Sequence, residues 1–547
     1  YLNLLCEFLF LWIMITTGYT KCVSLFLLAF AKLHMSSATG FLMQSNGSFA
    51  EVAAVVGCGE VCNVEMQEVE KDLLPLWRVL PKTAWGRINR RSLRYLAHQY
   101  FVRTSSLVVR GLEPGQLVTD SASDILSERI PDTIDSLPLD RAMQGFTLSD
   151  ATIVVTALRQ AISDFEWTFL EEICRERGVL SLPGMRVSFQ EELAEILDDF
   201  MLNWIVGDSA RGLHVASLSH RHLQTAIPAW DNVLAIVRNQ IRAFDFQSGA
   251  TLEHSYSLDD VYSIVGNITR SFAWFHKTDC DAMETHLIRM DTRGTGRVPL
   301  SNFWAAGKSV DWRFAESVSH LRDLGALDET SVWHGHQVII PNYLQAASNC
   351  IVSTSYYSVC CTSRCDEVRR DIEVAVGAPV GSPQEILEVV GTLTPGFFDD
   401  EEPLVVPTAL RLRLDEIATG GGVRLHGRLF AQWLHYVFPR ECAFPHKGGT
   451  VSAFERLRTK DVKVTEEEIT SHAGSPTANW SYDSEGTEWM TQWSAEEELM
   501  AGHESPCCFG FVRVVGWALL LSSVVSIGLS QFSDQKQLDI VEKLHVV

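Results

Sequence analysis

Basic residues are scarce in this chain. Its 547 residues include 45 Lys and Arg against 68 Asp and Glu, which gives a formal net charge of −23 at pH 7. A protein that binds nucleic acid through phosphate contacts needs a basic surface. The composition therefore argues against a nucleic-acid partner, and we expect none.

Motifs that define common catalytic sites are also missing. The sequence holds no GxSxG nucleophile elbow, P-loop, GxGxxG fingerprint or HExxH pair. Its 13 cysteines form no CxxC array with zinc-finger spacing. No repeat with a period of about 20–50 residues is visible, which argues against a solenoid. These absences leave enzymatic activity undecided and favour a protein that is not an enzyme.

A long uncharged apolar run lies near the end of the printed sequence. Residues 514–532 carry no charge and stand between Arg513 and Asp534. At about 1.5 Å per residue, a helix of that length spans the roughly 30 Å of bilayer hydrocarbon. We expect a single transmembrane helix at 509–532 and a short tail at 533–547. A buried core helix is the alternative.

A second apolar region opens the sequence. If translation starts at Met14, Lys21 supplies a positive flank, residues 22–31 an apolar core and residues 36–38 a cleavage site of small residues. Residues 1–38 are therefore predicted to be a secretory signal peptide. An N-terminal anchor and an untranslated extension remain open alternatives.

The two apolar ends predict a single-pass membrane protein whose bulk is luminal or extracellular. Asn46, Asn267 and Asn479 stand in Asn-x-Ser/Thr sequons, so we expect a glycoprotein. With 46% hydrophobic and 10% aromatic residues, the chain has a globular composition. Residues 39–450 are expected to form one large, mostly helical body.

Residues 451–508 are predicted to form an acidic linker or stalk between this body and the membrane. No Lys or Arg occurs from 464 to 512, where acidic residues are frequent. Trp480, Trp489 and Trp493 are unusual in a plain spacer. A protein partner that binds this stretch is therefore an alternative to a simple spacer.

Helical periodicity dominates the body and predicts a mainly α fold. Ser257 and Asp260 have the spacing of a capping box and are expected to open a helix that runs to about residue 276. Residues 337–341 are expected to form a strand. The other expected helices occupy residues 150–178, 191–207, 383–391, 409–418 and 427–437.

One part of the body resembles an EF-hand, expected at residues 279–313. A helix is predicted up to residue 290, and the loop DTRGTGRVPLSN follows. Asp291 falls on position 1 of the calcium loop, Gly296 on the turn at position 6 and Val298 on the apolar position 8. The spacing therefore predicts a degenerate helix–loop–helix element.

The ligand positions of this loop depart from the pattern. Arg293, Thr295 and Asn302 replace the expected oxygen ligands at positions 3, 5 and 12, and Arg297 stands at position 7. Asp291 is the single anionic residue, and the two arginines oppose a cation. We expect weak calcium binding or none.

A cysteine cluster forms another candidate site. Cys360, Cys361 and Cys365 lie close together, and Cys350 precedes them. In an oxidising compartment such cysteines form structural disulfides. Redox activity or the binding of a soft metal is the alternative.

Histidines extend this second candidate site. His435, Cys442 and His446 can all ligate a transition metal, and they lie in one short segment. His426 and His435 are nine residues apart, on opposite sides of a helix, so they are not expected to share an ion. Ordinary packing of these side chains is the preferred interpretation.

Several stretches resemble a large uncharacterised family of proteins from unicellular algae and related protists. The resemblance extends over residues 69–446 and implies one extended helical unit with no catalytic residues to carry over. It rests on LPKTAWGRINRRSLRYLAHQYF, GTGRVPLSNF, FAESVSHLRDLGALDE, IIPNYLQAASNCIVSTSYYSVCC and HGRLFAQWLHYVFPRECAFPH.

Two functions follow from these observations. The first is a membrane-tethered protein with a luminal or surface-exposed helical body that serves interaction or a weak calcium response. The second is an enzyme of unknown substrate that uses the Cys/His clusters for metal or redox chemistry. Apart from calcium at low affinity, no cofactor is indicated.

Overall fold

In the computed structural model, the chain divides into two compact units, Tyr1–Glu68 and Val69–Val547. In the first unit only the beginning of one helix is described, so the following account concerns the second. The described residues are 60–112, 145–179, 186–187, 189–206, 230–249, 255–307, 314–330, 335–354, 356–393, 404–447, 463–472 and 490–499.

The expected leader at 1–38, the expected membrane helix at 509–532 and most of the expected stalk lie outside these residues. The sequons at Asn46 and Asn479 lie outside them too. Among the helices that are described, none combines the length and the apolar character needed to cross a bilayer.

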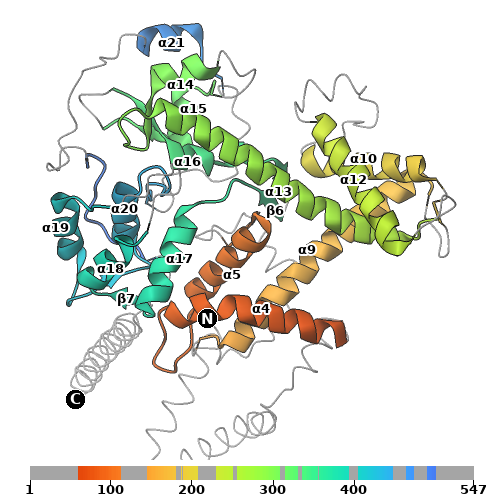
Figure 1. Cartoon of the computed structure of the whole chain (residues 1–547), viewed down its shortest axis with the longest axis horizontal. Helices are drawn as coiled ribbons and strands as arrows, with labels where there is room; N and C mark the ends of the chain where they lie inside the picture. The colour runs from red at the N-terminus through yellow and green to blue at the C-terminus, as the bar shows by residue number, and fades with distance from the viewer. Residues whose placement is uncertain are drawn as a thin grey trace, which may run out of the picture. The chain divides into compact units, whose positions relative to one another are not determined.

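The expectation of a mainly helical protein is confirmed (Figure 1). The described helices are α4 (Glu60–Val79), α5 (Arg90–Ser105), α9 (Leu148–Glu176), α10 (Gln190–Val206), α12 (Trp230–Ser248), α13 (Leu258–Met290), α14 (Leu300–Gly307), α15 (Val318–Asp323), α16 (Ile340–Leu344), α17 (Cys365–Val376), α18 (Pro383–Val390), α19 (Thr408–Ile417), α20 (Arg428–Val437) and α21 (Glu466–His472), with a short 3-10 helix at Ala347–Asn349.

The strands are short and form three small antiparallel sheets in the described part of the chain. The first has the order β1-β6-β5, the second β2-β4-β3 and the third β7-β8. The strands are β1 (Leu107–Val109), β2 (Arg297–Pro299), β3 (Leu327–Asp328), β4 (Gln337–Ile339), β5 (Val352–Ser353), β6 (Tyr357–Val359), β7 (Val380–Gly381) and β8 (Val423–Arg424).

Local capping signals explain where the long helices begin. Thr147 and Asp150 form a reciprocal capping box at the start of α9, and Ser257 and Asp260 form another at the start of α13. In each box the hydroxyl accepts from a backbone N–H while the carboxylate accepts from the N-cap N–H, which satisfies two donors that the helix leaves unpaired.

Helix α13 is longer than the sequence predicted. A stop near residue 276 was expected, with a second helix from 279, but the helix runs unbroken from Leu258 to Met290. The segment between the two expected helices, His276 to Asp279, contains neither Gly nor Pro, so nothing in its backbone interrupts the hydrogen-bond ladder.

Two separate hydrophobic cores share α13. Its first half contributes Ile264, Ile268 and Phe272 to a core formed with α5, α9, α10 and α12. Its second half contributes Leu287 and Ile288 to a smaller core around β2, β4, α14 and α16. Figure 1 shows α13 running between these two groups of elements.

A third core lies around α20. The fully buried Phe430 and Trp433 pack with side chains from α17, α18 and α19. The indole nitrogen of Trp433 donates to the backbone carbonyl of Leu410 at 2.8 Å, which joins α20 to α19. A buried polar group that finds a partner in this way avoids the cost of desolvation.

Three disulfides cross-link the described body. Cys280–Cys361 joins α13 to the residue that follows β6 by two, and Cys350–Cys360 ties the approach of β5 to the end of β6. Cys365–Cys442 joins the first residue of α17 to the loop after α20. The first and third close loops of 81 and 77 residues, so they constrain the unfolded chain most.

Candidate functional site

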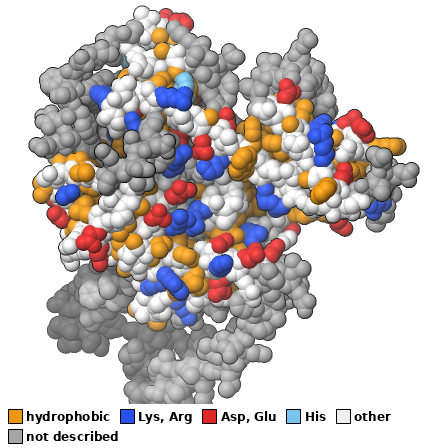
Figure 2. All heavy atoms as spheres, in the orientation of Figure 1, with side chains coloured by type: hydrophobic (Ala, Val, Ile, Leu, Met, Phe, Trp, Pro, Cys, Tyr) orange, Lys and Arg blue, Asp and Glu red, His pale blue; other side chains and the backbone are white. Residues whose placement is uncertain are grey.

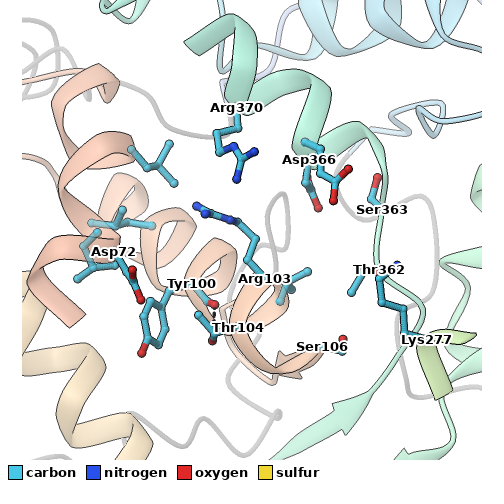
Figure 3. A pocket seen from close by; sticks show the side chains of 15 residues that line it. Asp72, Tyr100, Arg103, Thr104, Ser106, Lys277, Thr362, Ser363, Asp366 and Arg370 are labelled. Carbon is cyan, nitrogen blue, oxygen red and sulfur yellow. Dashed lines mark hydrogen bonds between the residues drawn. The ribbon is translucent and has the colours of Figure 1, made fainter. Parts of the chain in front are cut away.

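A cavity of about 290 Å³ lies between α5 and α17. This volume is near the lower end of the range of roughly 300–1,000 Å³ found for ligand sites. Helix α4, Lys277 of α13 and the segment before α17 complete its wall. Figure 3 shows the side chains that line it.

Three cationic side chains line this cavity. Arg103 stands in the last turn of α5, Arg370 on α17 and Lys277 on α13. Figure 3 shows the Arg103 and Arg370 guanidinium groups pointing toward one another across the cavity. Like charges that face each other across open space are stabilised by an anion placed between them.

These cations are weakly engaged by the protein itself. Lys277 lies 3.4 Å from Asp281, and Arg370 lies 3.5 Å from Asp371. Both pairs are largely exposed, and such pairs stabilise a protein by about 0–1 kcal/mol. Arg103 makes no hydrogen bond or ion pair with the residues that the structure describes.

Hydroxyl groups occupy a second part of the wall. The side chains of Ser106, Thr362 and Ser363 line the cavity and make no side-chain hydrogen bond to any residue in the described ranges. They are therefore able to donate to, or accept from, a ligand.

Ser106 is also one of the two non-glycine residues with positive φ in the described part, at φ 53°. Its N–H donates to Val102 O at 3.0 Å, and its carbonyl accepts from Cys360 N at 3.2 Å. The left-handed conformation costs a non-glycine residue roughly 1–2 kcal/mol. These contacts hold Ser106 in that conformation at the cavity wall.

Carboxylates complete the cavity. Asp72 and Glu367 are exposed at its wall, and Asp366 is half-buried. Burial raises the pKa of Asp366, against the lowering effect of Arg369, of a 3.4 Å hydrogen bond from Gln99 and of Arg103. A carboxyl group beside two guanidinium groups makes the net charge of this site depend on pH.

The surrounding surface has charges of both signs. On the face drawn in Figure 2, acidic and basic side chains are interspersed rather than separated into opposite patches. An extended basic stripe, which phosphate backbones require, does not run across the described residues on that face. The cavity therefore suits a small polar ligand better than a charged polymer.

The EF-hand-like loop is arranged differently from an open calcium site. Asp291 is the C-cap of α13, and its carboxylate accepts hydrogen bonds from Thr295 N at 3.0 Å and Gly296 N at 2.8 Å. Arg440 donates from Nε to the same carboxylate at 3.0 Å and from Nη2 to Asp291 O at 2.9 Å. The Arg440 guanidinium thus supplies the positive charge at this carboxylate.

Arg297, a second residue of this loop, is held in an ion pair, and Asn302 lies on the following helix. Arg297 donates from Nε to Asp328 at 2.7 Å, and both side chains are buried. Asn302 is exposed on α14, and Arg293 is half-buried. The structure therefore does not gather Arg293, Thr295, Arg297 and Asn302 around an ion.

The predicted Cys/His group is not assembled either. Cys360 is paired with Cys350, Cys361 with Cys280, and Cys365 with Cys442, so these sulfurs are not free thiolates. This agrees with the preferred interpretation of these cysteines as structural disulfides, and the alternative of a redox or soft-metal site stays a prediction.

The two predicted histidines have local partners. His435 is fully buried, and its Nδ1 lies 2.7 Å from Cys442 O. Burial lowers the pKa of His435 to about 3, with smaller effects from nearby charges, so the ring is neutral. His446 Nε2 lies 2.7 Å from Gly325 O. In each ring, the nitrogen that contacts a backbone carbonyl is therefore already occupied.

A different His/Cys group exists that could hold a metal. Ligand atoms of His276, Cys280 and Cys361 lie within 4.8 Å of one another, and all three residues are buried. The bond between Cys280 and Cys361 competes with metal binding, because a disulfide sulfur is not a thiolate ligand.

The sequence analysis did not predict the cavity. It also did not predict that Arg440 would pair with Asp291, or that Asp328 would pair with Arg297. Arg103, Arg370 and Lys277 carry no local motif. Arg440 lies 149 residues from Asp291, and Asp328 lies 31 residues from Arg297. One signal was present, since an arginine within a calcium loop requires a carboxylate partner elsewhere when it is buried.

Comparisons with known proteins add no name to this geometry. No protein-family model matches the chain, and neither a curated protein nor a solved structure matches it. The resemblance to a protist family therefore stays a prediction.

Proposed function

We propose that this chain is a membrane-tethered binding protein and that the cavity between α5 and α17 takes a small hydroxylated organic anion. The class includes sugars or other polyols that carry a carboxylate, sulfate or phosphate group. The observation that carries the proposal is the pair of facing guanidinium groups, Arg103 and Arg370. They lie beside the hydroxyls of Ser106, Thr362 and Ser363, which make no side-chain hydrogen bond within the described ranges.

The charge pattern favours binding over chemistry. Guanidinium groups recognise carboxylate and phosphate oxygens through paired N–H donors. Hydroxyl groups then discriminate among ligands by hydrogen bonding to their remaining polar atoms. Since no histidine or thiol lines the cavity among the described residues, the second function, a Cys/His enzyme, gains no support at this site.

A luminal or extracellular position for the body is part of the proposal. Three disulfides are typical of proteins that mature in an oxidising compartment. The tether would be residues 509–532, and residues 1–38 would direct export. Within the expected stalk at 451–508, residues 463–472 and 490–499 pack on the body instead: Ile469 and Met490 join its cores, and Gln492 accepts a hydrogen bond from Arg297. The proposed stalk is therefore confined to the other residues of that range.

Glycosylation within the described body has one candidate position. Asn267 lies inside α13, and its amide oxygen accepts from Arg270 at 2.6 Å. Glycosylated sequons occupy surface loops, so this helical setting disfavours Asn267. Asn46 and Asn479 remain the proposed acceptors.

A weak calcium response is the second candidate function. It is favoured by the backbone of residues 291–302, which turns at Gly296 and places Val298 opposite Val338 in a short antiparallel pair, in the manner of an EF-hand loop. The Arg440 guanidinium opposes it. We propose that calcium binds here at millimolar affinity at best, and that partners of the acidic stalk act independently of it.

The binding proposal is tested by thermal melts of the full chain in detergent with matched ligands. A uronic acid, a sugar phosphate and a sulfated sugar are compared with the corresponding neutral sugar. At least one anionic sugar is expected to raise the melting temperature, and the neutral sugar is not.

Variants localise the effect. Arg103→Ala and Arg370→Ala are expected to abolish the ligand-dependent shift, while Arg242→Ala, an exposed arginine on α12, keeps it. A shift that survives both cavity substitutions, or the absence of any shift across the anionic sugars, overturns the proposal.

A further inference from the structure

The group His276, Cys280 and Cys361 has the geometry of a metal site that is closed by a disulfide. His276 and Cys280 lie one turn apart on the same face of α13, and Cys361 approaches from the segment after β6. His276 Nε2 lies 3.6 Å from Cys280 Sγ and 4.0 Å from Cys361 Sγ. The three residues are 5%, 7% and 7% exposed, so the group is shielded from bulk water.

These distances are close to those between ligands of a tetrahedral zinc ion. With Zn–S bonds of about 2.3 Å and Zn–N bonds of about 2.0–2.1 Å, neighbouring nitrogen and sulfur ligands lie roughly 3.6 Å apart. The imidazole nitrogen therefore already stands at ligand distance from both sulfurs. Only the two sulfurs need to separate, to about 3.8 Å, once the bond between them is broken.

The histidine is what distinguishes this disulfide from the others. A disulfide that serves stability alone needs no imidazole beside its sulfurs. Zinc sites, in contrast, combine cysteine and histidine ligands, and a His/Cys pair one helical turn apart presents both to one ion. Within the described residues, no second His/Cys group comes within this range.

We propose that these three residues form a redox-gated zinc site. A small dithiol reductant attacks the Cys280–Cys361 bond. The reductant becomes a disulfide, and Cys280 and Cys361 become thiols. Zinc then displaces the two thiol protons, and two thiolates with the neutral imidazole bind the ion. Water takes the fourth position. A disulfide oxidant restores the Cys280–Cys361 bond by exchange, is itself reduced to a dithiol, and thereby releases the metal.

The proposed zinc site adjoins the cavity, because residues next to its ligands line the cavity wall. Lys277 follows His276 in α13, Thr362 follows Cys361, and both Lys277 and Thr362 line the cavity wall. A change from a disulfide to a metal-bridged pair separates the two sulfurs, which belong to the same two chain segments. The redox state therefore acts directly behind the proposed ligand site.

Cobalt binding to the full chain tests the proposal. The protein is prepared oxidised or treated with dithiothreitol, and Co²⁺ is titrated while thiolate-to-cobalt and ligand-field absorption bands are recorded. The reduced protein is expected to take up about one tightly bound ion with tetrahedral bands, which zinc then displaces. The oxidised protein is expected to show neither band.

Variants assign the ligands. His276→Gln and Cys361→Ser are each expected to weaken cobalt binding by more than the roughly 10–100-fold typical of an outer-shell change. The double variant Cys350→Ser, Cys360→Ser removes a different disulfide and is expected to retain the bands. Circular dichroism of each reduced variant distinguishes lost ligands from lost folding.

Two results overturn the proposal. One is a reduced, folded wild-type protein that shows no tetrahedral cobalt bands. The other is a His276→Gln variant, folded by circular dichroism, that binds cobalt as tightly as the wild type.

Discussion

The loop at residues 291–302 and the cavity between α5 and α17 are both rich in charge, but they use it in opposite ways. In the loop, Asp291 is held by Arg440, and Arg297 is held by Asp328. In the cavity, Arg103 and Arg370 point at one another across open space. The charges of the loop are buried and paired, whereas those of the cavity are more exposed and have only weak partners.

This difference shows that a recognisable motif need not mark a binding site. The loop carries a recognisable spacing yet has the paired charges of a structural element. The cavity has no motif, but three cationic side chains and several hydroxyls line its wall, and the ion pairs of Lys277 and Arg370 are weak and exposed. The following predictions test the comparison, beginning with the largest expected effect.

The buried ion pair of the loop is expected to give the largest loss of stability. Arg297→Met leaves Asp328, whose side chain is 3% exposed, without its partner. Removing one member of a buried pair costs about 3–5 kcal/mol of unfolding free energy. Urea denaturation measures the change. The control is Arg322→Met, whose pair with Glu329 is exposed, with an expected loss of at most about 1 kcal/mol. Equal losses would contradict the comparison.

The glycines of the loop are expected to differ in their tolerance of alanine. Both have positive φ, but a Cβ on Gly296 would lie 1.8 Å from Pro439 O, whereas a Cβ on Gly294 meets nothing nearer than Arg440 at 3.8 Å. Gly296→Ala should therefore cost about 1–3 kcal/mol more than Gly294→Ala, through overpacking added to the same backbone strain. Thermal melts of the two variants measure the difference, and similar melting temperatures would show that Pro439 yields.

Ligand binding in the cavity is expected to depend on pH through Asp366. Because burial raises the pKa of this carboxyl, it becomes neutral at a higher pH than an exposed aspartate does. An anionic ligand should bind more tightly as the pH falls through that raised pKa, since one repelling charge disappears. The expected gain is roughly fivefold, the effect of about 1 kcal/mol.

Titration calorimetry at several pH values measures this gain. Asp366→Asn should bind as tightly at neutral pH as the wild type does in acid, with the pH dependence flattened. An Asp366→Asn variant that keeps the full pH dependence of binding would show that another titratable group is responsible.

Calcium is expected to have the smallest effect. Arg293→Asp with Asn302→Glu restores two anionic ligands, but Arg440 still holds Asp291, so calcium at about 1 mM should not raise the melting temperature. Adding Arg440→Gln should open the loop and give about 0.4 kcal/mol of stabilisation when Kd equals the calcium concentration. Magnesium serves as the control ion. Equal calcium responses of the double and triple variants would show that Arg440 does not block the site.

Local signals made much of the fold predictable. The box at Ser257 and Asp260 opens α13 as expected, and the helices at 383–391, 409–418 and 427–437 appear within a residue or two. Capping and periodicity act over a few residues, so sequence reports them well. The length of α13 was underestimated because no local stop was present.

The sites were harder to predict because they are made by distant residues. The cysteines at 360 and 361 are neighbours in sequence, yet their partners lie at positions 350 and 280. The cavity joins α5 to α17, which are separated by more than half of the body. A pattern read along the chain does not contain such pairings, because they arise only when the cores have formed.

Helix α13 also determines how the body can be divided. It extends about 50 Å, from 33 residues at about 1.5 Å each, and both of the cores that it serves depend on it. Neither core can be excised at a flexible linker, since the connection is itself a continuous hydrogen-bonded rod. Because both cores bury side chains of this one helix, we expect them to unfold in one cooperative transition. A fragment designed to fold by itself should therefore keep α13 whole.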